Sequence, residues 1–137
     1  MSDVNDWVFN IESNIFTIIS TVAKRKLGTK YPNINFTTTD LPSSTTTKFP
    51  CVYLHELQGA ERGNDLENIS INAVDYYMQV EVITNKSPQE VKDVMSVLTD
   101  IFKQLHFNIN PMPYFQNETT TYRSIMRVSR LICDGDI

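Results

Sequence analysis

The stretch that most constrains the fold is residues 74–82, where every second residue is apolar. The apolar positions are Val74, Tyr76, Met78, Val80 and Val82, and they alternate with Asp75, Tyr77, Gln79 and Glu81. A period of two, rich in β-branched and aromatic residues, predicts a β-strand with one face buried and one face in contact with water. We therefore expect a long strand here, on which a small sheet is built.

Length and composition predict one globular domain over residues 1–137. A chain of roughly 150 residues buries about two-thirds of its unfolded surface, which is enough for a core of its own. The net charge of −4 argues against a nucleic-acid binder. The sequence has no run of about 18 apolar residues, so we expect no membrane-spanning helix. The acidic, polar N-terminus also lacks the features of a secretory signal.

The two cysteines, Cys51 and Cys133, lie far apart in the sequence. A disulfide needs an oxidising compartment, so without an export signal we expect two free thiols that are buried as small apolar groups. Among the other Cys and His residues, only His55 lies within four residues of either cysteine. A zinc site needs more ligands at close spacing, and none is expected.

Residues 3–27 carry apolar side chains at alternating steps of four and three, which predicts an amphipathic helix. The stripe consists of Val4, Val8, Ile11, Ile15, Ile18 and Val22. Lys24, Arg25 and Lys26 fall in the last turn, where cations meet the negative end of the helix dipole. Gly28 then follows as a stop signal. A phosphate contact is the alternative interpretation of the three basic residues.

A second helix is expected after the long strand, because Ser87, Pro88 and Glu90 form a start signal. Ser87 can cap the free amides, Pro88 suits the first helical position, and Glu90 can reach back to complete a capping box. The apolar stripe that follows predicts a face packed on the core and consists of Val91, Val94, Leu98, Ile101 and Leu105. We expect His106 and Phe107 to end this helix.

Two further strands are predicted beside the central one. In residues 51–57, Val52 and Leu54 share one face, whereas Tyr53 and His55 share the other. In residues 119–133, one face carries Arg123, Ile125, Arg127 and Ser129, and the other carries Tyr122, Ser124, Met126, Val128 and Ile132. If this last strand neighbours the central one, its arginines face Asp75 and Glu81 across the pair.

The remaining segments are connections. Residues 34–37 are read as a short strand, and the threonine-rich residues 37–48 as an exposed loop, either a mobile crossing or an arm that orders on a partner. Residues 58–68 read as a charged hairpin tip, and residues 108–117 as an extended connector. The order of elements predicts an α+β two-layer sandwich, in which two helices pack on one face of a largely antiparallel sheet of four or five strands.

The pattern resembles the tail terminator (tail completion, or neck) proteins of long-tailed bacteriophages. The similarity rests on the N-terminal helix, a strand opened by Phe49-Pro50, a charged hairpin loop, and a long strand that ends in V-E-V-I-T-N at residues 80–85. A capped helix with aromatic residues before an asparagine follows, and then a strand that begins with Tyr122-Arg123 and runs down to an aspartate. The resemblance covers nearly the whole chain as an order of elements with scattered matching residues.

The resemblance implies a structural virion protein rather than an enzyme. Such proteins form a ring, commonly a hexamer, that caps the last ring of the tail tube, stops tail elongation and docks to the head-to-tail connector. The implied location is the tail or neck of the virion, assembled in the cytoplasm of the bacterial host. The implied partners are further copies of the chain, the tail tube protein, the connector protein and, in a contractile tail, the sheath protein. DNA passes through the lumen without specific binding, as an acidic chain favours.

Ring closure requires two different complementary patches on each subunit. We expect the charged hairpin tip and a basic strand face to set the register, and apolar side chains to supply most of the binding free energy. These interface candidates are Glu61, Arg62, Asp65 and Glu67 at the tip, Arg123 and Arg127 on the strand, and Tyr77, Tyr114, Phe115 and Ile125 as apolar contacts.

Other functions remain open at this stage. A related stopper or adaptor of the neck shares these features, and an unrelated α+β interaction module is a further alternative. An enzyme is disfavoured because the sequence shows no nucleophile–base pair, metal cluster or phosphate-binding loop, and no cofactor is expected. His55 beside Glu56 suggests a general base, but a strand histidine on the wetter face is the simpler interpretation.

Overall fold

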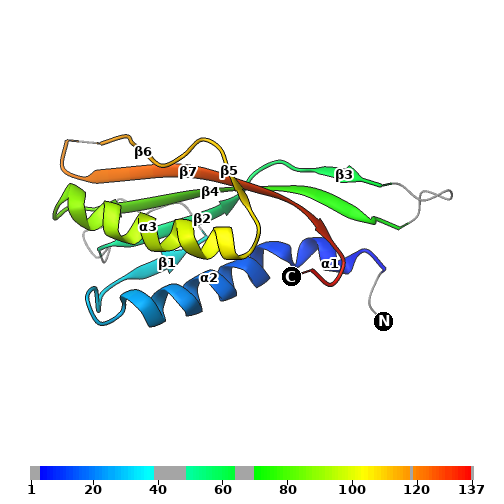
Figure 1. The fold of residues 1–137 in the computed structure, drawn as a ribbon, viewed down its shortest axis with the longest axis horizontal. Helices are drawn as coiled ribbons and strands as arrows, with labels where there is room; N and C mark the ends of the chain where they lie inside the picture. The colour runs from blue at the N-terminus through cyan, green and yellow to red at the C-terminus, as the bar shows by residue number, and fades with distance from the viewer. Residues whose placement is uncertain (1–3, 39–48, 64–69, 118, 137) are drawn as a thin grey trace.

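The computed structural model describes residues 4–38, 49–63, 70–117 and 119–136. Within these residues, two long helices lie side by side on one face of a mixed sheet (Figure 1). They are α2 (Ile11–Leu27) and α3 (Pro88–Gln104), and a short helix, α1 (Asp6–Phe9), precedes them. The predicted α+β two-layer sandwich is confirmed.

The sheet is built on three antiparallel strands, and shorter strands extend its edges. The central strands are β2 (Cys51–Glu56), β4 (Ala73–Thr84) and β7 (Tyr122–Cys133). The short strands are β1 (Asn35–Thr37), parallel to β2, β3 (Ala60–Arg62) beside β4, and β5 (Asn108–Ile109) and β6 (Tyr114–Phe115) beside β7. The described residues thus hold seven strands rather than four or five, because strands of two or three residues are too short to show a period.

The predicted alternation in β4 is confirmed on the side that faces the helices. Tyr76, Met78, Val80 and Val82 are buried, and only Val74, near the start of the strand, is partly exposed. The matching faces of β2 and β7 are also buried, with Val52, Leu54, Met126, Val128 and Ile132 in the core. These side chains meet the apolar stripes of α2 and α3 and form one continuous core.

The predicted N-terminal helix is interrupted at Asn10. The Asn10 amide donates to the Trp7 carbonyl at 3.2 Å, and its carbonyl accepts the Asn14 amide at 3.0 Å, so this residue ends α1 and begins α2. Asn5 Oδ1 accepts the Ile71 amide at 2.8 Å, which holds α1 against the segment before β4. The buried line of α2 also runs in steps of four, through Ile11, Ile15, Ile19, Ala23 and Leu27, so Ile18 and Val22 lie beside it and are only half-buried.

The expected end of the second helix is confirmed in detail. His106 follows the last residues of α3 with φ 68°, in the left-handed region. The His106 amide donates to the Lys103 carbonyl and the Phe107 amide to the Phe102 carbonyl, both at 3.0 Å. Phe107 packs edge-on against Phe102, with ring centroids 5.3 Å apart. This arrangement is a Schellman motif, in which the final turn satisfies its own carbonyls and an apolar contact closes it.

Replacing His106 with glycine should stabilise the fold. Glycine adopts a positive φ without the Cβ penalty, so His106→Gly should raise the free energy of unfolding by roughly 0.5–1 kcal/mol. Urea denaturation monitored by circular dichroism would measure the change. His106→Ala is the matched control, because it removes the imidazole and keeps the Cβ. If alanine stabilised the protein as much as glycine, strain at this position would not be the cause.

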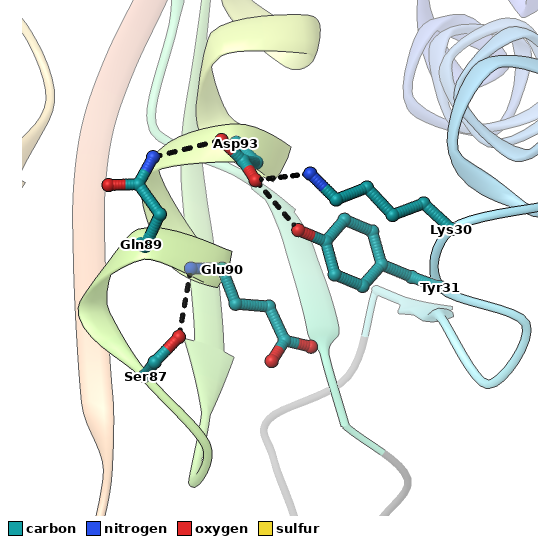
Figure 2. A network of polar contacts seen from close by, with 6 residues as sticks. All are labelled: Lys30, Tyr31, Ser87, Gln89, Glu90 and Asp93. Atoms are coloured by element: carbon teal, nitrogen blue, oxygen red, sulfur yellow. Dashed lines mark hydrogen bonds and ion pairs between the residues drawn. The ribbon is translucent and has the colours of Figure 1, made fainter.

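The predicted start signal of α3 is half realised. Ser87 Oγ accepts the Glu90 amide at 3.2 Å, and Pro88 occupies the first helical position. Figure 2 shows the Glu90 side chain leaving the helix towards Tyr31 instead of turning back to Ser87. Glu90 is 6% exposed, and its Oε1 has no hydrogen-bond partner among the described residues. The reciprocal half of the capping box is therefore not formed.

Asp93 ties α3 to the segment that leaves α2 (Figure 2). Its Oδ2 accepts from Lys30 Nζ at 2.8 Å and from the Tyr31 hydroxyl at 2.9 Å, and its Oδ1 accepts from Gln89 Nε2 at 3.1 Å. The hydrogen bonds from Lys30, Tyr31 and Gln89 lower the pKa of Asp93 from 3.8 to about 2. Three donors stabilise the charged carboxylate, which makes this the polar link between the two helices.

The Asp93 link should make the free energy of unfolding depend on pH in the acid range. A folded-state pKa below the unfolded value means that the stabilisation is present above about pH 3.8 and is lost as the pH falls towards about 2. Asp93→Asn should cost up to about 1 kcal/mol at neutral pH, as for a partly exposed pair. Denaturation curves of both proteins between neutral pH and pH 2 should converge at the acid end. A constant difference across that range would contradict this assignment.

The two cysteines lie far apart in the fold. Cys51 pairs with Ile83 and Cys133 with Ala73, at opposite ends of β4. At about 3.3 Å per residue, ten residues of strand separate them by about 33 Å, so they cannot form a disulfide with each other. Cys51 is buried as expected, and burial raises the pKa of its thiol. Cys133 is exposed, which corrects the expectation of two buried thiols.

Candidate interaction surface

The face of the sheet that the helices leave uncovered carries most of the predicted interface residues. In the β4–β7 ladder, Glu81 pairs with Ile125, Gln79 with Arg127, and Tyr77 with Ser129. Tyr53 and His55 of β2 pair with Glu81 and Gln79 from the other side. We call this surface the outer face. Its residues alternate with the core residues of the same strands. The two-residue period of a strand therefore places one set on the outer face and the other set in the core.

A polar network centred on Glu81 occupies the middle of the outer face. Arg123 Nη1 lies 3.5 Å from Glu81 Oε1, and Gln79 Nε2 donates to Glu81 Oε2 at 3.1 Å. His55 Nε2 lies 3.5 Å from the same Oε2, outside hydrogen-bond geometry, and the His55 ring stacks on Tyr53 with centroids 4.5 Å apart. The Glu81 side chain is only 8% exposed. This carboxylate is therefore held inside the subunit by its neighbours.

The two predicted basic residues lie together, as expected, but they differ in role. Arg123 pairs with buried Glu81, and its side chain is 26% exposed. Arg127 is exposed and donates from Nε to Gln79 Oε1 at 3.2 Å. The expectation that this strand faces Glu81 is confirmed, whereas Asp75 pairs with Arg62 of β3 instead. Arg127 is consequently the better candidate for an intermolecular contact.

The predicted apolar contacts also differ in how exposed they are. Tyr77 is 41% exposed and Tyr114 of β6 is 44% exposed, as an apolar contact surface requires. Phe115, 39% exposed, lies on the helix side of the sheet, where the Lys92 ammonium is 5.8 Å from its ring centroid. Ile125 is only 5% exposed, beside its register partner Tyr114, so it belongs to the subunit interior and not to an outer contact. Leu131, 51% exposed, joins this set although the sequence pattern did not single it out. The sequence does not show that Leu131 pairs with Asp75 in the β4–β7 ladder and therefore lies diagonally across from Tyr77.

The charged hairpin is only partly described. Glu61 and Arg62 lie in β3 and are exposed, and Arg62 is fixed by its ion pair with Asp75. Asp65 and Glu67 lie outside the described residues, as does most of the threonine-rich segment at 37–48. In the described part, β3 projects beyond α3 at one end of the molecule (Figure 1). The hairpin base is thus available to a neighbour.

Neither a metal-binding cluster nor a membrane-spanning helix is found in the described residues. They contain no group of three or more His, Cys, Asp or Glu side chains placed to hold a metal ion. None of the helices in the described part of the chain is long and apolar enough to cross a membrane. No protein-family model matches the chain, and no curated protein matches it either. The surface geometry is therefore the basis for a functional proposal.

The different roles of the two arginines give a stability prediction. Arg123→Leu leaves the buried Glu81 carboxylate without its cation and should lower the free energy of unfolding by about 1–3 kcal/mol. Arg127→Leu is the matched control and should cost less than about 1 kcal/mol, because its partner is neutral and the site is exposed. Adding Glu81→Gln to Arg123→Leu should recover part of the loss in a double-mutant cycle. Equal losses for the two arginine variants would contradict this account.

Proposed function

We propose that the protein is a ring-forming structural subunit of a long-tailed bacteriophage, acting as the tail terminator. In this role it caps the last ring of the tail tube, stops elongation and provides the docking surface for the head connector. The order of elements and the matching residues on which the resemblance rests support this proposal. The net charge of −4 suits a lumen through which DNA slides.

The observation that carries the proposal is the uncovered apolar patch on the outer face. Tyr77 and Leu131 lie diagonally across the β4–β7 ladder and are 41% and 51% exposed. Together with Asp75 and Ser129 they line a depression of about 280 Å³. Large exposed apolar side chains that lie diagonally across neighbouring strands of one face are typical of a protein contact, whereas scattered ones need no partner. We call Tyr77 and Leu131 the outer patch.

The outer patch suits assembly better than catalysis. Its polar neighbours are already paired, since Asp75 binds Arg62 and Gln79 binds both Glu81 and Arg127. Paired groups set orientation, while apolar burial supplies the free energy of association. In the proposed ring, each subunit places this patch on a neighbouring copy or on the tail tube protein.

Ring formation is the direct test. Native mass spectrometry and negative-stain imaging of the purified chain should show a closed ring, commonly a hexamer. Tyr77→Ser with Leu131→Ser should weaken assembly at least about tenfold, because each lost apolar contact is worth roughly 1.5–3 kcal/mol when fully buried.

Met112→Ser is the control, since Met112 is 62% exposed on the connector between β5 and β6 and is not part of the outer patch. A chain that stays monomeric at high concentration, with or without tail tube protein, would contradict the terminator role and favour an interaction module. A ring that forms equally well in the double variant would remove the outer patch from the interface.

A further inference from the structure

A pocket of about 230 Å³ lies where the sheet projects past the helices, on the opposite side of β4 from the outer patch. Its apolar walls come from Val8 of α1 and from Ile71 and Val74 near the start of β4. Its polar groups come from Glu56 at the end of β2, Glu61 of β3 and Tyr76 of β4. Two carboxylates on an apolar wall form an unusual opening, which we call the acidic pocket.

A third carboxylate lies against the acidic pocket. Glu12, in the first turn of α2, accepts the Glu56 amide through Oε2 at 3.2 Å. Burial, and then the Glu12 carboxyl group, raise the pKa of Glu56. Two neighbouring carboxylates repel each other when both are charged, and a cation placed between them would relieve the repulsion.

The Tyr76 hydroxyl is the second, independent sign of a ligand. Tyr76 is 1% exposed and lines the pocket, yet its hydroxyl has no hydrogen-bond partner among the described residues. Burial, and then the charges of Glu56 and Glu12, raise the pKa of this hydroxyl. A buried hydroxyl without a partner is rare in a folded protein and calls for an explanation. A donor that enters the pocket would satisfy it.

The ligand that fits is a basic side chain. A lysine ammonium has three N–H donors and an arginine guanidinium has five, which suits two carboxylates and a hydroxyl oxygen. The aliphatic stem of either residue would pack on the walls at Val8, Ile71 and Val74. A small inorganic cation would leave those apolar walls without a contact.

The chain itself carries such side chains at the other end of the same helix. Lys24, Arg25 and Lys26 are exposed in the last turn of α2, and no ion pair among the described residues involves them. They lie about 20 Å along the helix from Glu12, at 1.5 Å per residue. Figure 1 shows the start of α2 at the end from which β3 projects, and its C-terminal turn at the opposite end. The triplet therefore cannot reach the pocket of its own subunit.

We propose that the acidic pocket of one subunit binds the Lys24–Lys26 triplet of a second copy, head to tail. This inference rests on the proposed ring and names one of its contacts. Different patches at the two ends of one subunit form a heterologous contact, which closes into a ring when the rotation allows. The opposite charges of the two ends also favour this orientation over its reverse.

Two variants, each defective at one end, test the contact. Glu56→Lys reverses a charge in the acidic pocket, and Arg25→Glu with Lys26→Glu reverses two charges in the triplet. Lys24 is left in place because its ammonium lies over the Phe36 ring, 5.7 Å from the centroid. Each variant alone should assemble at least tenfold more weakly than the unmodified chain, so that no ring is seen at concentrations where the unmodified chain forms one. An equimolar mixture should regain association in native mass spectrometry, because the intact triplet of one variant meets the intact pocket of the other, and the two reversed patches are also of opposite charge.

Controls separate folding from assembly. Circular dichroism should show that both variants are folded. If the pocket variant is not folded, Glu56→Gln replaces it; if the triplet variant is not folded, Arg25→Gln with Lys26→Gln replaces it. Lys86→Glu, at an exposed lysine that belongs to neither the acidic pocket nor the triplet, should assemble like the unmodified chain.

Each outcome decides one claim. Rings in the unmodified chain and in both variants would overturn the pocket–triplet contact and leave the terminator role standing. Two variants that fail to assemble alone and form no mixed complex when combined would show that the triplet is not the ligand of the pocket. An unmodified chain that never assembles would overturn the ring itself, and this contact with it.

Discussion

The structure depends on the register between β4 and β7. Every residue from Ala73 to Thr84 has a partner in the stretch from Cys133 back to Tyr122. Because side chains alternate between faces, a slip of one residue would turn Glu81 and its neighbours towards the helices and expose the core residues. Burying an unpaired carboxylate among apolar side chains costs several kcal/mol, so this single register is strongly favoured.

Much of the fold could be predicted because it is encoded locally. The alternation of β4 and the cap at Ser87 each need fewer than ten neighbouring residues, and both are found in the structure. The break at Asn10 could not be predicted in this way, because it accompanies a hydrogen bond from the distant Ile71 amide to Asn5. Very short strands such as β5 and β6 likewise depend on a partner and not on a pattern of their own.

The candidate surface was harder to predict for the same reason. The alternation in the last strand correctly placed Arg123, Ile125 and Arg127 on one face, but it could not rank their exposure. Exposure depends on what lies across the strands: Arg123 meets buried Glu81, and Ile125 pairs with Tyr114 of β6. Non-local neighbours therefore decided which members of one face are free to meet a partner.

The projecting end of the β4–β7 ladder links both proposed contacts. The ladder continues past the last residue of β2 that pairs with it, and β3 covers the remaining edge of β4. Successive residues there point to opposite faces, so Tyr76 lines the acidic pocket while Tyr77 belongs to the outer patch. The subunit thus has unlike surfaces on the two sides of this projection, and its basic helix end lies far from both. A head-to-tail ring requires this kind of asymmetry. Since the ladder sets where each side chain points, its register determines the proposed contacts as well as the core.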